Sequence, residues 1–209
     1  MPPEVAALIC DATEPHLPAL DPWEALWAPY DEATYAAVLQ AIEPADVVLE
    51  IGAGDLRLAR RLAEEAHQVI AWEIQADLLA QGAVQGPLPC NLTVAVVDAR
   101  VEPMPDGVTA AVLLMRHCSH YASYVARLRA MGCRRLITNA RWRSGLETID
   151  LALAAPFAAA WPGWYACRRC GAVGWAGADP AWVDEAALAR VTDVEGCPAC
   201  GSGIRNGQP

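Results

Sequence analysis

The 209-residue sequence contains no lysine, so all 15 of its basic residues are arginine, against 25 acidic residues and a formal net charge of −10. This balance argues against unspecific binding to nucleic acid or to an anionic membrane surface. No apolar run approaches the ~20 residues that span a bilayer, although 55% of the residues are hydrophobic. The first ten residues carry an acid and no base, unlike a secretory signal. We therefore expect a cytoplasmic protein with no membrane partner.

A second absence is local. Residues 107–146 contain no Asp or Glu, yet they include seven arginines, at positions 116, 127, 129, 134, 135, 141 and 143. Two interpretations stay open. These side chains either lie on a solvated helix and pair with acids elsewhere, or they form a cationic rim that faces an anionic substrate, since guanidinium groups recognise phosphate and carboxylate well.

The most informative stretch is residues 46–79. Val47–Ile51 is a short apolar run that is typical of a strand buried on both faces. Gly52-Ala53-Gly54 then allows a sharp turn and a close approach of a ligand to the backbone. Apolar residues recur at helical spacing over residues 56–63, and Val69–Trp72 predicts a second buried strand. The stretch therefore predicts a βαβ unit with a ligand site at the strand ends.

The residue types at those ends restrict the ligand. A dinucleotide fingerprint requires a third glycine where this chain has Arg57, so NAD is disfavoured. Glu50, two residues before Gly52, suits a cationic amino group, and Glu73, at the end of the second strand, suits a pair of ribose hydroxyls. S-adenosylmethionine (SAM) carries both groups and no phosphate.

The motif Glu50-Ile51-Gly52-Ala53-Gly54 resembles the first motif of the class I SAM-dependent methyltransferases, E/D-x-G-x-G-x-G, with Leu56 in place of the last glycine. The resemblance covers residues 30–140. It implies an α/β fold with a Rossmann-like, mostly parallel sheet and helices on both faces. It also implies the SAM-binding residues: Glu50, Gly52, Ala53 and Gly54 for the amino-acid end, Glu73 and Ile74 for the ribose, and Asp98 and Ala99 for the adenine.

Further elements follow the same alternation. The patterning predicts helices over 31–42, 75–82 and 121–131, and strands over 92–97, 108–115 and 134–139. This alternation indicates a parallel sheet with right-handed crossovers. The resemblance implies a sixth and a seventh strand, but residues 146–152 fit either a strand or a short helix. The sheet is therefore expected to be shortened at its C-terminal end.

The reacting groups are expected just after the strand at 108–115. His117 or His120 can deprotonate an acceptor, because an imidazole titrates near neutral pH, and Tyr121 and Tyr124 can line a pocket. A histidine on a loop also commonly has only a structural role. The segment lacks the Asn/Asp-Pro-Pro-Tyr of enzymes that methylate nucleobase amino groups, and it lacks the Asn-Leu-Pro-Tyr of the rRNA adenine dimethylases.

The methyl acceptor therefore stays open between a small anionic molecule and an RNA guided by the arginine-rich segment. A groove lined by Arg127, Arg134 or Arg141 would favour RNA. A different interpretation also survives, in which a degenerate SAM-binding domain serves as a scaffold. A single cavity that joins Glu73 to the segment 116–121 would count against the scaffold.

Four of the eight cysteines form two matched pairs, Cys167-x2-Cys170 and Cys197-x2-Cys200, each followed by glycine. Such knuckles resemble a zinc ribbon and predict one structural, four-sulfur Zn²⁺ site, with disulfides or a redox pair as alternatives. The 26 residues between the pairs are expected to include a helix over 180–190. We expect a lead-in over 1–30, a SAM-binding domain over 31–155 and a zinc-ribbon module over 156–209, the last with a structural role or a protein partner.

Overall fold

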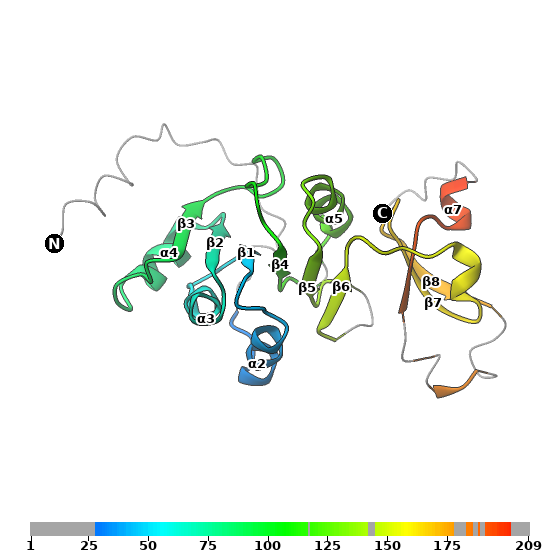
Figure 1. Ribbon diagram of the computed structural model, residues 1–209, viewed down its shortest axis with the longest axis horizontal. Coiled ribbons are helices and arrows are strands. Elements are labelled where there is room, and N and C mark those ends of the chain that lie inside the picture. Colours follow the sequence, from blue (N-terminus) through cyan, green and yellow to red (C-terminus); the bar gives the residue numbers. More distant parts are fainter. Residues whose placement is uncertain are drawn as a thin grey trace.

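The computed structural model of the protein describes residues 28–116, 118–141, 145–177, 183–185, 188 and 191–201. Strands and helices alternate over the first two thirds of the chain (Figure 1). The elements are α2 (Glu32–Gln40), β1 (Val47–Ile51), α3 (Arg57–Glu65), β2 (Gln68–Glu73), α4 (Ala76–Ala83), β3 (Leu92–Val96), β4 (Ala110–Leu113), α5 (Tyr121–Ala130), β5 (Arg135–Thr138), β6 (Glu147–Asp150), η1 (Phe157–Ala160), β7 (Gly163–Cys167), β8 (Val173–Ala176), β9 (Val191–Val194) and α7 (Pro198–Gly201).

The larger sheet has six strands in the order β3-β2-β1-β4-β5-β6. Its neighbours are parallel except for β5 and β6, which run antiparallel. Each strand and helix expected between residues 31 and 139 is confirmed. The ambiguous segment at 146–152 forms the edge strand β6, so the described sheet has one strand fewer than the seven that the resemblance implies. This order is that of a Rossmann-like sheet: β2 and β3 are added on one side of β1, and β4, β5 and β6 on the other, so the strand order reverses between β1 and β4.

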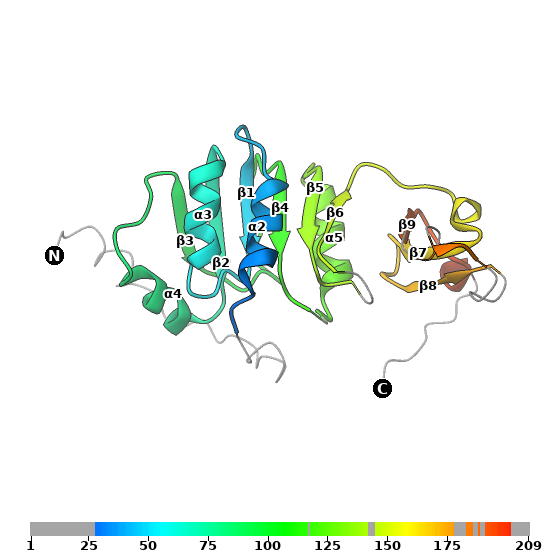
Figure 2. The ribbon, with the colours of Figure 1, turned by 90° about the horizontal axis from the view of Figure 1, so that it is seen from below.

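Helices cover both faces of this sheet (Figures 1 and 2). Val38 of α2 and Leu62 of α3 pack with Val48 of β1 on one face. Leu128 of α5 packs with Leu49 of β1 on the other. Successive side chains of a strand point to opposite faces, so a strand buried on both sides needs an unbroken apolar run. In β1 this run is residues 47–49, and Glu50 follows it.

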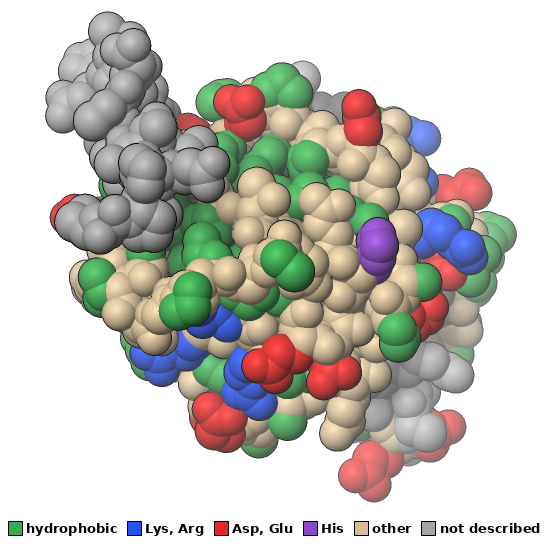
Figure 3. All heavy atoms as spheres, turned by 60° about the vertical axis from the view of Figure 1, so that its left-hand side comes forward, with side chains coloured by type: hydrophobic (Ala, Val, Ile, Leu, Met, Phe, Trp, Pro, Cys, Tyr) green, Lys and Arg blue, Asp and Glu red, His purple; other side chains and the backbone are tan. Residues whose placement is uncertain are grey.

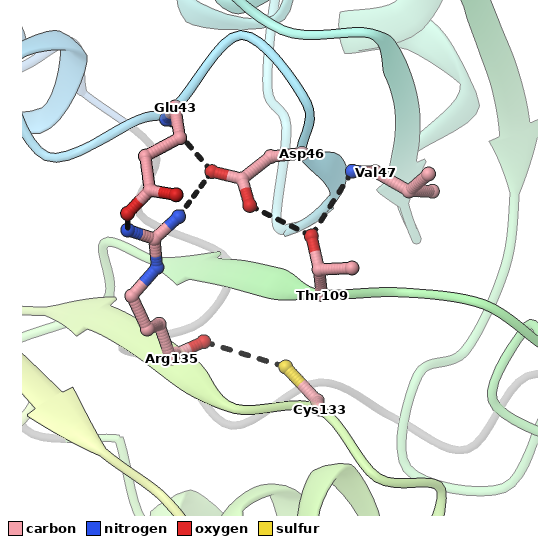
Figure 4. Close-up of polar contacts among 6 residues, drawn as sticks. All are labelled: Glu43, Asp46, Val47, Thr109, Cys133 and Arg135. Carbon is pink, nitrogen blue, oxygen red and sulfur yellow. Dashed lines mark hydrogen bonds and ion pairs between the residues drawn. The ribbon is translucent and has the colours of Figure 1, made fainter.

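A polar network joins the amino ends of three strands (Figure 4). Asp46, which is buried, accepts a hydrogen bond from the Thr109 hydroxyl at 2.7 Å, and that hydroxyl accepts one from the Val47 N–H at 3.1 Å. Arg135 of β5 forms ion pairs with both Asp46 and Glu43. The network ties β1, β4 and β5 together at the end of the sheet opposite the Gly52–Gly54 turn.

The last part of the chain forms a second, three-stranded sheet in the order β8-β7-β9. It has a small core of its own that includes Ala160, Ala176 and Val194. The helix expected over 180–190 lies largely outside the described residues, as do His117 and residues 1–27. None of the described helices is long and apolar enough to cross a membrane.

Helix α4 meets the turn after β1 through Gly82. A Cβ atom at this position would lie 2.3 Å from the carbonyl oxygen of Asp55 and 2.9 Å from Cγ of Leu56. The Arg60 guanidinium donates to the Gly82 carbonyl at 3.1 Å and to the Gly86 carbonyl at 2.8 Å. The absence of a side chain at Gly82 therefore sets how closely α4 approaches the turn.

We predict that Gly82→Ala destabilises the protein by about 1–3 kcal/mol because the new methyl group overpacks against backbone. Within a helix, Gly→Ala ordinarily stabilises the protein by about 1 kcal/mol. A loss of stability would therefore indicate the close contact, and a gain would indicate ordinary helix propensity. Urea unfolding measures it. Gly145→Ala, where the added Cβ has no atom within 4 Å, is the control. A Gly82→Ala variant at least as stable as the parent would contradict the close contact.

Candidate functional site

A cavity of about 630 Å³ lies at the carboxyl ends of β1, β2 and β4 and over the segment that follows β3. Such a position, where the strand order reverses, is where open α/β sheets bind ligands. One cavity joins Glu73 to Arg116, the first residue of the segment 116–121, which counts against the scaffold interpretation, although residues 118–121 do not line it. All but one of the residues predicted to bind SAM line it, namely Glu50, Gly52, Ala53, Glu73, Ile74, Asp98 and Ala99. The exception, Gly54, lies in the turn directly beside them.

The turn between β1 and α3 has left-handed backbone at three positions: Gly52 (φ 80°), Gly54 (φ 55°) and Leu56 (φ 64°). Leu56, which stands where the resembled motif has its last glycine, thus has a left-handed backbone, although a left-handed residue with a side chain costs about 1–2 kcal/mol. The Leu56 side chain is fully buried, and burying a leucine contributes about 1.5–3 kcal/mol. Burial therefore offsets the strain, and the turn keeps its shape without the third glycine.

The Glu73 carboxylate holds the turn in place. Its Oε2 accepts a hydrogen bond from the Gly54 N–H at 2.8 Å, and its Oε1 accepts from the N–H groups of Ile74 and Gln75 at 2.9 Å each. Glu73 is buried, with 5% of its surface exposed. Since Oε2 accepts one bond here, it retains a lone pair for a ligand hydroxyl.

Glu50 is the unusual group of the site. It is 4% exposed, and its Oε2 atom has no hydrogen-bond partner among the described residues. Burial raises the pKa of Glu50 well above its ordinary value, and the nearby carboxylates of Glu73 and Asp55 raise it further. A buried carboxyl group without a partner costs on the order of 1–3 kcal/mol or more. Glu50 in the cavity wall therefore fits a cationic ligand group.

Two Asp-x-Arg pairs flank the cavity, and the sequence interpretation missed both. Asp98 accepts hydrogen bonds from the Arg100 side chain at 2.8 and 2.9 Å, and these bonds lower the pKa of Asp98 despite its burial. Asp55 is paired in the same way with Arg57, which lowers the pKa of Asp55 against the opposing effect of burial. The repeated Asp-x-Arg spacing at two strand ends was the signal available in the sequence.

The segment before α2 and the first turns of α2 form another wall of the cavity, with Tyr30 from the segment and Tyr35 from the helix among the lining residues. The Tyr30 N–H donates to the Tyr35 hydroxyl at 3.0 Å, and the Arg116 guanidinium lies 5.8 Å from the centre of the Tyr30 ring. Unlike Arg57 and Arg100, Arg116 forms no ion pair within the described residues. Asp31, which also lines the cavity, faces this charge: hydrogen bonds from Thr34 chiefly lower the pKa of Asp31, and Arg116 lowers it further. Arg116 is thus a cavity arginine that a carboxylate faces without forming an ion pair within the described residues.

The structure separates the residues proposed for catalysis. His117 lies outside the described residues. His120 is the N-terminal capping residue of α5, and its ring meets that of Tyr124 edge-on at 6.4 Å. Tyr124 lines the main cavity, whereas Tyr121 lines a smaller one between α5 and the second sheet. The structure thus brings Tyr124, with His120 behind it, to the cavity, and it does not bring Tyr121 there.

Three of the six described arginines between 116 and 141 bind groups within the protein. The Arg127 side chain donates to the carbonyls of Ala99 and Glu102. Arg135 belongs to the Asp46 network. Arg141 is 6% exposed and pairs with two acids. Arg127 and Arg141 therefore do not line a groove for RNA, and on the face drawn in Figure 3 basic and acidic side chains are interspersed.

The four paired cysteines form one cluster at the ends of β7 and β9. Their ligand atoms all lie within 4.8 Å of one another. Individual Sγ–Sγ separations are 3.4 Å for Cys167 and Cys200, 3.7 Å for Cys170 and Cys197, and 3.8 Å for Cys197 and Cys200. Four sulfurs placed about 2.3 Å from a tetrahedral Zn²⁺ lie about 3.8 Å apart. The donor set and its spacing therefore fit zinc.

The cysteine module is docked on the larger sheet by charge and shape. Arg141, after β5, donates to Glu147 of β6 at 2.7 Å and to Asp193 of β9 at 2.7 Å. Burial raises the pKa of Asp193, although Arg141 opposes that shift. Gly171, which follows the first knuckle, lies so close to α5 that a Cβ there would sit 2.6 Å from Cβ of Ala122.

The sequence matches no protein-family model and no curated protein. Among solved structures, the chain is similar to precorrin 8W decarboxylase from Methanobacterium thermoautotrophicum, with 18% identity and a TM-score of 0.48 over 57% of this chain and 68% of that chain. It is also similar to a SAM-dependent methyltransferase from Mesorhizobium loti, with 18% identity and a TM-score of 0.46 over 69% and 64%. A third is a dimethyladenosine transferase from Plasmodium falciparum, with 20% identity and a TM-score of 0.44 over 52% and 41%. The matched part thus spans less than two thirds of the second and third structures.

We predict that the purified protein binds one zinc ion per chain and that serine at Cys170 or Cys197 abolishes stoichiometric binding, because three sulfurs leave the tetrahedral site open. Elemental analysis after gel filtration measures the metal content. Cys90→Ser is the control, since Cys90 is exposed and lies outside the cluster. A metal-free native protein with Cys167 and Cys170 joined to Cys197 and Cys200 by disulfides would contradict the prediction.

Proposed function

We propose that the protein is a SAM-dependent methyltransferase that acts on a small anionic acceptor. The observation that carries the proposal is the Glu50 carboxyl group, which is buried in the cavity wall and lacks a partner for Oε2. A ligand ammonium group would supply that partner. Bound SAM brings such a group together with ribose hydroxyls, an adenine and an electrophilic methyl group on sulfur.

The proposed roles of the cavity residues follow from their chemistry. Glu50 receives the ammonium group, and Gly52 and Ala53 leave room for the ligand beside the backbone. Glu73 accepts a ribose hydroxyl through the lone pair that remains on Oε2. Asp98 and Ala99 face the adenine. Holding donor and acceptor in line supplies much of the rate of a displacement reaction, so the walls of the cavity contribute chiefly by orientation.

An anionic acceptor is supported by Arg116, at the end of β4. Its guanidinium lies over the Tyr30 ring and forms no ion pair within the described residues. Tyr124 lines the same cavity, and the His120 ring contacts the Tyr124 ring at the start of α5. These two residues are proposed to receive or relay the acceptor's proton, with His117 and Tyr121 as the alternatives that the sequence suggests. A small acceptor is favoured over RNA because Arg127 and Arg141 are engaged within the protein.

We predict that SAM binding releases a proton from Glu50. Because its pKa is raised, Glu50 stays protonated at pH values above the ordinary glutamate pKa of about 4.3. An ammonium group beside it lowers the pKa of Glu50 again. Affinity therefore rises with pH up to the raised pKa of the free protein. Calorimetric titration in buffers of different ionisation enthalpy detects the proton.

In the same titration we expect Glu50→Gln to abolish the proton release and to weaken binding about 10- to 100-fold, the effect of losing a hydrogen bond to a charged group. Glu64→Gln, on the exposed side of α3, makes the same substitution outside the cavity and serves as the control. A folded protein that does not bind SAM would refute the proposed function.

We further predict that Arg116→Gln lowers methyl transfer to the acceptor about 10- to 100-fold while SAM affinity changes little. Incubation with methyl-labelled SAM and a cell extract, followed by separation of small anionic molecules from RNA, shows where the label goes. Arg134→Gln is the control, because Arg134 is exposed and lies outside the cavity. Label recovered only in RNA would exclude a small acceptor.

A further inference from the structure

The segment after β3 presents two hydrogen-bonding groups to the cavity. The Asp98 carbonyl accepts hydrogen bonds from the N–H groups of Val101 at 3.1 Å and Glu102 at 3.0 Å. Because a trans peptide points its C=O and N–H in opposite directions, these bonds direct the N–H of Ala99 away from the turn. That N–H has no partner among the described residues.

The second group is the Asp98 carboxylate, whose orientation depends on Arg100. Oδ1 accepts from the backbone N–H of Arg100 at 2.9 Å and from Nε at 2.8 Å, while Oδ2 accepts from the guanidinium at 2.9 Å. A carboxylate oxygen accepts about two hydrogen bonds. Oδ1 is therefore saturated, and Oδ2 keeps one acceptor position. The Arg127 side chain, bonded to the carbonyls of Ala99 and Glu102, fixes the same segment from α5.

We propose that Arg100 is a positioning residue that makes the cavity select a 6-aminopurine over a 6-oxopurine. With Arg100 in place, Asp98 is an ionised acceptor with one position left, next to the Ala99 donor. An adenine edge offers the matching donor and acceptor, whereas a hypoxanthine edge offers an oxygen to Asp98 and an N–H to Ala99. The inference rests on the proposed function, since it assumes that the purine of SAM lies here.

An alternative role for Arg100, competition with the purine for Asp98, predicts the opposite change in affinity. If the Asp98–Arg100 pair merely competed with the purine, removing Arg100 would free the carboxylate and tighten binding. If Arg100 positions Asp98, its removal leaves a buried carboxyl group that can rotate and take up a proton. Protonated Asp98 donates to an oxygen as readily as the ionised form accepts from an amino group, so the discrimination that Asp98 makes is lost and only that of the Ala99 N–H remains.

The test compares S-adenosylhomocysteine with its deaminated analogue, S-inosylhomocysteine, by calorimetric titration of the zinc-loaded full chain. We expect the parent protein to prefer the adenine compound about 10- to 100-fold. Arg100→Met should weaken binding of the adenine compound about 10-fold and reduce the preference towards unity. Arg100→Lys keeps the charge without the two-point contact and should restore only part of the preference.

Arg57→Met is the matched control. Arg57 holds Asp55 through the same Asp-x-Arg contact at the other end of the cavity, so its loss should leave the ratio of the two affinities unchanged. Circular dichroism verifies that each variant is folded. Tightened binding by Arg100→Met, or an unchanged ratio, would overturn the role of Arg100. Failure of the folded parent to bind either compound would instead refute the proposed function together with the inference.

Discussion

The ligand end of the molecule depends on the three hydrogen bonds that the Glu73 carboxylate accepts. One bond comes from Gly54 in the turn after β1, and the other two come from Ile74 and Gln75 at the start of α4. A single side chain at the end of β2 thus fixes the turn on one side and the next helix on the other. Gly82 then lets the far end of α4 return to the same turn. Both sets of contacts converge on the turn after β1, and they hold this wall of the cavity in one position.

Charge inside the cavity is arranged by local pairing. Two aspartates hold arginines two residues further along the chain, so neither pair leaves a large field. Glu50 and Arg116 differ, because Glu50 has an oxygen without a partner and Arg116, which interacts with Asp31 at longer range, forms no ion pair in the described part of the chain. A buried acid without a partner and an arginine without an ion pair in one cavity favour a ligand pair with a cation at one site and an anion at the other. The proposed donor and acceptor have that complementarity.

The sequence predicted the alternating elements because parallel strands buried on both faces need continuous apolar runs, as in Val47–Ile51 and Val69–Trp72. It also predicted the residues at the strand ends, where Glu50, Glu73 and Asp98 gather. It could not predict which tyrosine of α5 reaches the cavity, since Tyr121 faces a second sheet that forms from residues more than 40 positions later. Distant pairing also explains why the sequence left open whether the arginines between 116 and 143 face a substrate or pair with acids of the protein. The partners of Arg135 and Arg141 lie as far away as Glu43 and Asp193.

The Arg141 contacts also bear on the order in which the chain emerges during synthesis. Arg141 and Glu147 are made together, and Asp193 follows only after 46 further residues. β6 is the edge strand of the larger sheet, and an exposed edge is a hazard for pairing with other chains. The incomplete ion cluster keeps charge at that edge and opposes such pairing. Once β9 has formed, Arg141 also binds Asp193, and the same charged groups connect the two sheets. One cluster therefore first opposes pairing with other chains and then holds the two sheets together.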